Sequence, residues 1–539
     1  MATLLPPPKR VKVYHGVPEP EPVPQAPSSN IVVQFVSEDD GQPLAPAVNL
    51  PANLSREALE GLLNKLSPQV PQEDPVPFSF HVQLPEDDVK IPGAPTRIVI
   101  SKSIEDDILK HPLNSRSFTE EDVFVVHCSP QSVFRVRPPT RCSSTLSGHS
   151  SPILCASFSP TGNFLATGSG DTTARLWNLG TEMPSHTLSG HMGWVLCVEW
   201  EAMERKLATG GHDGHVRIWD PKTGKPVGDA LKGHTKWITS LCWEPIHLNP
   251  SAPRLASSSK DNTVRVWSLL TRRVEYTLGG HTASVNVVKW GGVGTGVLYT
   301  ASSDRTVRVW DAEAGRPLHT LKDHAHWVTT LALNTDFVLR TGPFDHTGKK
   351  PTSDEEAQKL ALERYTAVLS TTPELLISGS DDHTLFLWSP FPNNQPTAAS
   401  AAPSTKTKPL GRLVGHSLQV SHVSFSPDGR WAASASWDSS VRIWEGRTGK
   451  YVATLRGHVG AVYRVAWSAD SRGVVSCGKD STVKTWDLKT YKIRNDLPGH
   501  TDEVYCVDFV ADKIVSGGRD RTVKMWALSL SSSSICAHF

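Results

Sequence analysis

The feature that most constrains this chain is a unit of about 40–45 residues that recurs eight times between residues 140 and 527. Each unit carries a histidine, then a serine or threonine, then an aspartate four residues further on, and a tryptophan six residues after the aspartate. The histidines are His149, His191, His234, His281, His324, His416, His458 and His500; the hydroxyl residues are Thr167, Thr209, Ser257, Thr300, Ser378, Ser434, Ser476 and Ser516; the aspartates are Asp171, Asp213, Asp261, Asp304, Asp382, Asp438, Asp480 and Asp520; the tryptophans are Trp177, Trp219, Trp267, Trp310, Trp388, Trp444, Trp486 and Trp526.

This unit resembles the WD40 repeat. Segments such as TVRVW alternate apolar and polar residues, which is typical of half-buried strands. One small sheet cannot bury both of its faces, so eight units predict eight blades stacked around an axis. The last unit ends after Trp526 without an outer strand, and RCSSTLSGH precedes the first histidine without a blade of its own. The resemblance therefore implies that residues 142–147 close the ring beside the final blade.

The histidine, hydroxyl and aspartate of a unit could also be read as a hydrolase triad. Eight copies argue against that interpretation, because an enzyme needs one preorganised site with an oxyanion hole and a pocket. In WD-repeat proteins these groups and the tryptophan form a buried hydrogen-bond chain, and buried polar groups need such partners. The resemblance thus gives His281, Thr300, Asp304 and Trp310, which represent all eight sets, a structural role.

Loop lengths distinguish the two faces of the predicted ring. Three insertions fall between the first and second or the third and fourth strands of a blade, and so on one face: EPIHLNPSAPR, the region about 334–372 and the region about 390–409. Residues 353–369 are predicted to form a helix, with Ser353 and Glu356 as a capping box. Its apolar stripe comprises Ala357, Ala361, Tyr365 and Val368. Such a helix either packs on the propeller or docks a partner.

The opposite face, here called the short-loop face, carries aromatic and basic residues. Trp194, Trp237 and Trp327 each lie three residues after a blade histidine, where the first strand of a blade begins. The turn before the blade aspartate carries, in different units, Trp437, Lys260, Lys479 and Arg519. Exposed aromatic rings beside cations are typical anchors for protein or RNA. Alternatively, these tryptophans pack beneath neighbouring loops.

The region before the repeats divides in two. Residues 1–28 are rich in proline and typical of a disordered tail, in which Lys9, Arg10 and Lys12 of PPPKRVKV resemble a nuclear localisation signal. Residues 29–130 contain the strand-like segments NIVVQFV, APAVNL, FSFHVQL and DVFVVHC and a helix SREALEGLLNKL, which together favour a ubiquitin-like β-grasp domain. In that helix Ser55 is the candidate N-cap, and the buried face is predicted to comprise Leu59, Leu62, Leu63 and Leu66. A linker 131–141 leads to the propeller, 142–527, and residues 528–539 form a second disordered tail.

Composition excludes several classes of protein. No stretch approaches 18 uninterrupted apolar residues, so no membrane span is expected, and the first residues lack the apolar core of a secretory signal. The eight cysteines are scattered without a CxxC pair, which favours a reducing compartment. Residues 29–130 hold sixteen acidic and seven basic side chains in a chain of net charge +1, so the remainder is mildly basic, a weak signal for nucleic acid. Without a phosphate loop or HExxH motif, we expect no enzymatic activity, no small-molecule substrate, no cofactor and no metal held by this chain alone.

The order of an acidic ubiquitin-like domain and an eight-bladed propeller is similar to the Notchless family of ribosome-assembly factors. The stretches that carry the resemblance are GHTKWITSLCWEPIHL, RLASSSKDNTVRVW, RTGPFDHTGKKPTSDEEAQKLALERY and LPGHTDEVY. The resemblance implies a factor of the large (60S) ribosomal subunit in the nucleolus and nucleoplasm, whose propeller sits on the pre-ribosome among rRNA and ribosomal proteins. It also implies that the ubiquitin-like NLE domain is bound by midasin, a giant AAA ATPase that pulls on it to remodel the particle.

The same resemblance assigns one residue of the N-terminal domain a metal-ligand role. In the family a glutamate before the last strand of this domain binds Mg²⁺ in the adhesion site of midasin. The loop FTEEDVFVV matches it with Glu121, followed by Asp122, and Glu120 is the alternative register. A carboxylate suits Mg²⁺, which prefers hard oxygen ligands. Two other functions stay open from the sequence, a substrate adaptor for ubiquitin ligation and a scaffold in Notch signalling.

Overall fold

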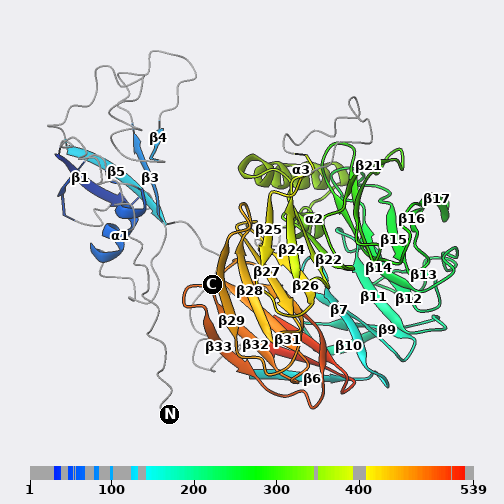
Figure 1. Ribbon diagram of the computed structural model, residues 1–539. Helices are drawn as coiled ribbons and strands as arrows, with labels where there is room; N and C mark the ends of the chain where they lie inside the picture. Colours follow the sequence, from blue (N-terminus) through cyan, green and yellow to red (C-terminus); the bar gives the residue numbers. More distant parts are fainter. Residues whose placement is uncertain are drawn as a thin grey trace, which may run out of the picture. The chain divides into compact units, whose positions relative to one another are not determined.

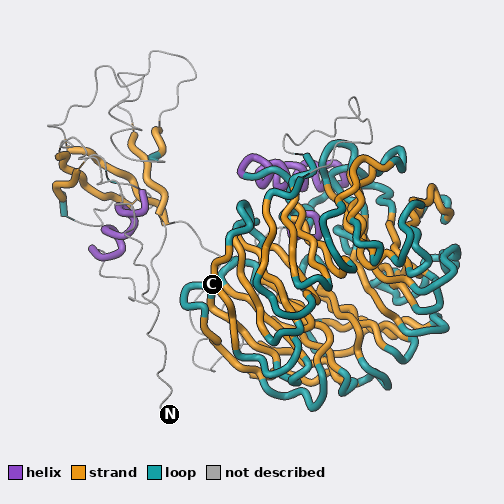
Figure 2. Tube along the Cα trace, viewed as in Figure 1, coloured by secondary structure: helices purple, strands orange, loops and turns teal. Residues whose placement is uncertain are grey.

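The computed structural model describes residues 30–37, 46–51, 54, 56–66, 78–83, 97–100, 123–130, 141–344, 350–391, 408–510 and 513–527. The chain divides into two compact units, Met1–Phe134 and Arg135–Phe539 (Figure 1). Figure 2 shows that strands dominate the second unit and that its few helical turns gather in one region. No helix among the described residues is both long and apolar enough to cross a membrane.

The N-terminal unit is a five-stranded sheet with one helix. Its elements are β1 (Asn30–Ser37), β2 (Val48–Pro51), α1 (Arg56–Leu66), β3 (Phe78–Gln83), β4 (Arg97–Val99) and β5 (Val123–Pro130), and the strands lie in the order β2-β1-β5-β3-β4. The central pair, β1 and β5, is parallel, and the other pairs are antiparallel. Leu59 and Leu63 of α1 are buried in one core with Ile31, Phe35 and Val126, which confirms the β-grasp expectation. Leu62 packs against this core, whereas Ser55 and the side chain of Leu66 lie outside the described residues.

The second unit is an eight-bladed propeller built from antiparallel sheets. The first four blades are β7 (Ile153–Phe158), β8 (Phe164–Ser169), β9 (Thr173–Asn178) and β10 (Met183–Ser189); β11 (Val195–Trp200), β12 (Leu207–Gly211) and β13 (Val216–Trp219); β14 (Ile238–Trp243), β15 (Leu255–Ser259), β16 (Val264–Ser268) and β17 (Arg273–Leu278); and β18 (Val285–Gly291), β19 (Val297–Ser302), β20 (Val307–Asp311) and β21 (Pro317–Leu321). The innermost strands of neighbouring blades contact each other around the ring, and β34 of the last blade contacts β7 of the first.

The last four blades follow the same plan. They are β22 (Val328–Leu333), β23 (Leu376–Ser380), β24 (Thr384–Trp388) and β25 (Gly411–Val414); β26 (Val420–Phe425), β27 (Trp431–Ser436), β28 (Ser440–Glu445) and β29 (Tyr451–Arg456); β30 (Val462–Trp467), β31 (Gly473–Gly478), β32 (Val483–Asp487) and β33 (Lys492–Leu497); and β34 (Val504–Val510), β35 (Lys513–Gly518) and β36 (Thr522–Ala527) with β6 (Arg141–Ser147). The pairing of β6 with β36 confirms that residues 142–147 complete the eighth blade.

Blade two departs from the four-stranded plan, because the segment after β13 forms two isolated bridges, Val216 with Leu231 and Trp219 with Pro226, in place of a regular outer strand. Pro226 has no N–H to donate to a ladder. Gly228 takes φ +72°, a left-handed conformation that interrupts a strand.

The insertion between β22 and β23 contains two helices, α2 (Asp336–Thr341) and α3 (Asp354–Thr371). The predicted helix is confirmed as α3, and Ser353 caps it by accepting a hydrogen bond from the Glu356 N–H at 3.2 Å. The reciprocal bond differs from a capping box, because the Glu356 carboxylate accepts from the N–H of Thr352 at 2.8 Å and not from that of Ser353.

Helix α3 packs on the propeller through the predicted stripe. Ala357, Ala361 and Tyr365 are buried and Val368 is half-buried. The two alanines lie against Ala202 and Ile246 of the loops of blades two and three.

Candidate functional site: the short-loop face of the propeller

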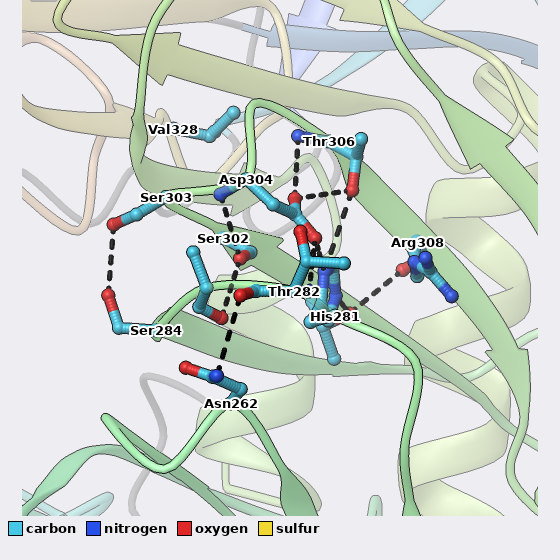
Figure 3. Close-up of polar contacts among 12 residues, drawn as sticks. Asn262, His281, Thr282, Ser284, Ser302, Ser303, Asp304, Thr306, Arg308 and Val328 are labelled. Atoms are coloured by element: carbon cyan, nitrogen blue, oxygen red, sulfur yellow. Dashed lines mark hydrogen bonds and ion pairs between the residues drawn. The ribbon is translucent and has the colours of Figure 1, made fainter.

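The four repeated residues of each blade form one hydrogen-bond chain, and Figure 3 shows His281 and Asp304 of blade four with the polar contacts around them. His281 Nδ1 lies 2.7 Å from Asp304 Oδ2, His281 Nε2 lies 2.8 Å from Thr300 Oγ1, and Trp310 Nε1 donates to Thr300 Oγ1 at 2.9 Å. An ionised aspartate only accepts, so Nδ1 carries the imidazole proton and Nε2 accepts from the threonine hydroxyl. Thr306 donates to the second oxygen of Asp304 through its backbone N–H at 3.0 Å and through its hydroxyl.

Burial separates this chain from a catalytic triad. Thr300 is fully buried, and its oxygen already accepts the indole N–H of Trp310. A nucleophile needs an open approach to a substrate, which this hydroxyl lacks. The geometry therefore supports a structural role: the chain ties the loop before a blade to its second and third strands.

The same hydrogen bonds recur in the other seven blades. They shift the pKa values of the aspartates and of some histidines. Burial raises the pKa of Asp304, but the hydrogen bonds from His281 and Thr306 outweigh it and hold this pKa well below its ordinary value. Asp213, Asp261, Asp382, Asp438 and Asp480 show the same net lowering. In the first blade, burial lowers the pKa of His149 by more than Asp171 raises it.

A first aromatic cluster on the short-loop face joins blades two and three. His212 stacks on Trp237 with ring centroids 4.7 Å apart, and it contacts Trp194 at 6.0 Å between centroids. Lys260 Nζ lies 4.0 Å from the centroid of the Trp237 ring. Trp194 is 56% exposed, whereas Trp237 is half-buried by its two neighbours. We call these four residues the Trp194 cluster.

A second aromatic cluster joins blades six, seven and eight. Trp437, 46% exposed, contacts the ring of Tyr463 edge-on at 6.3 Å, and Tyr463 contacts Tyr505 at 5.7 Å. The Tyr463 hydroxyl donates to Glu503 at 3.1 Å. The aromatic and basic pattern of the sequence did not include either tyrosine, although each lies five residues after its blade histidine, a shared position that could have revealed them.

Three further predicted residues lie on this face, and the backbone N–H of one of them, Arg519, donates to the Glu503 carbonyl beside the second cluster at 2.7 Å. Trp327 is 52% exposed and touches the ring of His326 at 5.2 Å. Lys479 is exposed, and the exposed Arg519 lies 3.7 Å from Asp502. The exposure of Trp194, Trp327 and Trp437 shows that these three rings do not pack beneath loops. Lys9, Arg10, Lys12, Glu120, Glu121 and Asp122 lie outside the described residues.

The opposite face is organised by the two helices. Tyr365 of α3 stacks on His247 at 4.6 Å and donates its hydroxyl to the buried Glu374 at 2.9 Å. Tyr299 donates to the other oxygen of Glu374 at 2.7 Å. Burial raises the pKa of Glu374 against the effect of these hydrogen bonds. Among the described residues, no group of three or more His, Cys, Asp or Glu side chains has the arrangement of a metal site.

Comparison with known proteins identifies both units. The model of the NLE (NUC135) domain matches residues 31–91. The model of the WD domain, G-beta repeat, matches eight segments: 140–178, 182–220, 224–268, 272–311, 365–389, 407–445, 449–487 and 491–527. Among solved structures, the computationally designed Ika8 protein is similar with a TM-score of 0.55 and 25% identity, covering 72% of this chain and all of that protein.

Full-length relatives share both units. Ribosome assembly protein 4 of Saccharomyces cerevisiae is 46% identical over 84% of this chain and 85% of its own length. Protein Notchless of Drosophila melanogaster is 42% identical over 75% of this chain and 76% of its own. The Notchless protein homolog of Arabidopsis thaliana is 44% identical over 79% of this chain and 82% of its own. The chain therefore belongs to the family of NLE-domain WD-repeat proteins that includes Notchless and Ribosome assembly protein 4.

Proposed function

We propose that this protein is a non-enzymatic ribosome-assembly factor whose propeller docks on the precursor of the large subunit through its short-loop face. The names of its relatives support a role in ribosome assembly. The observation that carries the docking surface is the Trp194 cluster, in which His212 joins tryptophans of two blades and Lys260 lies over the Trp237 ring.

The chemistry of this cluster fits a docking anchor. Its rings are held by one another, so little side-chain entropy is lost when a partner binds. Trp194 offers an open aromatic surface, and Lys260 places a cation over the neighbouring Trp237 ring. Such a surface can stack a base or an apolar side chain while the ammonium group meets a phosphate or carboxylate.

Sedimentation tests this docking surface. A variant with Trp237→Ala, Lys260→Glu and Lys479→Glu is expected to stay folded and to leave the fractions that contain large-subunit precursors. Arg447→Glu is the matched control, because Arg447 is exposed in the loop between β28 and β29 on the opposite face. Normal cosedimentation of the triple variant would refute docking through the short-loop face.

We further propose that the N-terminal domain engages midasin through one carboxylate. Glu121 lies two residues before β5 in the sequence and would supply an oxygen ligand to a Mg²⁺ ion held by midasin. The test is magnesium-dependent binding of the full chain to the isolated midasin adhesion domain. Glu121→Ala is expected to abolish binding and Glu121→Asp, shorter by one methylene, to weaken it. Loss of binding in Glu120→Ala alone would move the ligand by one residue, and binding that survives both changes and chelation would exclude the metal bridge.

The proposed site of action is the nucleolus and nucleoplasm. Lys9, Arg10 and Lys12 would act as the import signal. Replacement of all three by alanine in a fluorescent fusion is expected to move the protein out of the nucleus. Unchanged nuclear fluorescence would remove this role from the basic cluster.

A further inference from the structure

The axis of the propeller contains a cavity of 430 Å³. Its walls are the innermost strands, whose second, third and fifth residues are half-buried in a pattern that repeats in β11, β14, β26 and β30. These are the residues that face the channel. A volume of this size falls within the range of small-molecule sites, roughly 300–1,000 Å³.

Helix α2 crosses this channel at the end that carries the insertions. Asp336, its first residue, lies 3.5 Å from Lys289 of blade four, and Arg340 lies 3.4 Å from Asp508 of blade eight. Blades four and eight are opposite each other in an eight-bladed ring. The two ion pairs therefore hold α2 across the channel, which leaves the short-loop face as the route of entry.

The charges at this end of the channel are balanced among themselves. Glu199, Lys289 and Asp508 share the fifth position of their strands. Burial raises the pKa of Glu199, and Lys289 and Arg340 act in the opposite direction. The acidic side chains of the channel thus have their cations close by, in the layer next to α2.

Arg464 stands in the next layer without such a partner. It is the third residue of β30 and lines the cavity together with His422, the third residue of β26. Within the part of the chain that the structure describes, no carboxylate lies within 4.0 Å of its guanidinium group, which also makes no hydrogen bond. His422 Nδ1 is buried and has no hydrogen-bond partner either. Arg464 is half-buried, and a cation that is partly removed from water is normally paired, because the loss of hydration is costly.

The protonation state of His422 makes its ring a neutral hydrogen-bond donor or acceptor beside the Arg464 guanidinium group. Burial lowers its pKa to about 3, and Arg464 and Lys289 act in the same direction. The ring therefore adds no charge at neutral pH and can offer one N–H.

We propose that the channel is a binding site for a small free anion that carries a phosphate or carboxylate group, with Arg464 as its charge partner and His422 as a second hydrogen-bonding group. The planar guanidinium fork matches both kinds of group with two parallel hydrogen bonds. The anion enters from the short-loop face, past Tyr463, which directly precedes Arg464. Nothing in this site depends on the proposed docking on the pre-ribosome.

Titration of the full chain with inorganic phosphate and, separately, with citrate tests this site. Binding is measured by calorimetry at constant ionic strength, with thermal unfolding as a second readout. The wild type and Arg447→Met, an exposed control, are expected to bind one of the two anions with equal affinity. Arg464→Met is expected to bind it at least about tenfold more weakly, the effect of losing a charge-assisted hydrogen bond.

Three results would overturn the proposal: no binding of either anion to the wild type, equal binding to Arg464→Met, or an equal loss in Arg447→Met. If Arg464→Met does not fold, Arg464→Lys replaces it, since lysine keeps the charge without the planar fork. Severalfold weaker binding by Arg464→Lys would then support the site, and wild-type affinity would refute it.

Discussion

At the residue scale, the Thr300 hydroxyl links the tetrad of blade four, because it contacts both His281 and Trp310. Trp310→Phe keeps most of the buried ring but removes the N–H, which leaves the threonine oxygen with one donor fewer. We expect the free energy of unfolding to fall by about 1–3 kcal/mol. Urea denaturation measures this, and Trp327→Phe, which changes an exposed ring, is the control and should unfold like the wild type. Equal midpoints for both variants would contradict the structural role.

The lowered aspartate pKa values predict how stability depends on pH. A carboxyl whose pKa is lower in the folded state stabilises the protein above its unfolded pKa, about 3.9, and this contribution is lost as the pH falls through the folded pKa. His149 and His416, whose pKa values burial lowers, bind protons first in the unfolded chain. We therefore expect stability to decline below about pH 6.5 and more steeply below about pH 4.

One substitution isolates the aspartate contribution. Asp304→Asn is expected to have a lower free energy of unfolding than the wild type at pH 7. The difference should shrink as the pH falls below about 4, because the stabilisation by the wild-type carboxylate is then progressively lost. Trp310→Phe titrates no group, so its deficit should stay nearly constant over the same range. A constant deficit in Asp304→Asn as well would show that its charge contributes nothing.

The tetrads could be predicted from the sequence because their spacing is set within one blade. Contacts between blades depend instead on how neighbouring sheets pack. His212 meets Trp237 only because the turn of blade two reaches the start of blade three, and Tyr463 meets Trp437 in the same way. Likewise, the isolation of Arg464 depends on what every other blade places in the channel. Such contacts require the packing of neighbouring sheets, which spacing along the chain does not encode.

At the element scale, α3 meets the propeller at two small residues as well as at Tyr365. Ala361 is buried against the Ala202 and Ile246 loops, whereas the next residue, Leu362, is 46% exposed. Ala361→Asp would bury a charge without a partner, so we expect the helix to detach while the blades stay folded. Hydrogen exchange should then show faster exchange in residues 354–371 only. Leu362→Asp is the matched control, and fast exchange in both variants would mean that the helix is held in another way.

Helix α3 was predictable because it has a cap and three turns of apolar spacing, and α2 was not. Six residues, DFVLRT, are too few for a 3.6-residue period to stand out. Helix α2 is held by ion pairs to blades four and eight, which are distant in sequence. Pro226 and Gly228 in the sequence indicated an irregular outer edge in blade two, but the repeat pattern favoured a regular strand there.

At the scale of the whole molecule, the repeat count predicted the number of blades, and the missing strand after Trp526 predicted how the ring closes. The closure has a mechanical consequence under the proposed function. Residues 131–140 connect the N-terminal domain to β6 in the sequence, and β36 is the one partner of β6 among the strands that the structure describes. A force applied to the N-terminal domain would therefore reach the propeller at the strand that closes it.

Leu146 is the residue on which this closure can be tested. It pairs with Val523 and is buried in a core that contains residues of both the first and the last blade, among them Ile153 and Val515. Leu146→Ala is expected to cost about 2–5 kcal/mol, the range for truncating a buried leucine. Because the strand joins both ends of the ring, the loss should appear in the global urea transition and in exchange of the Val523 amide together. Thr145→Ala, one residue earlier and exposed, is the control and should change neither. Faster exchange of Val523 with an unchanged global transition would instead mean that β6 frays by itself, and that the ring holds without its closing strand.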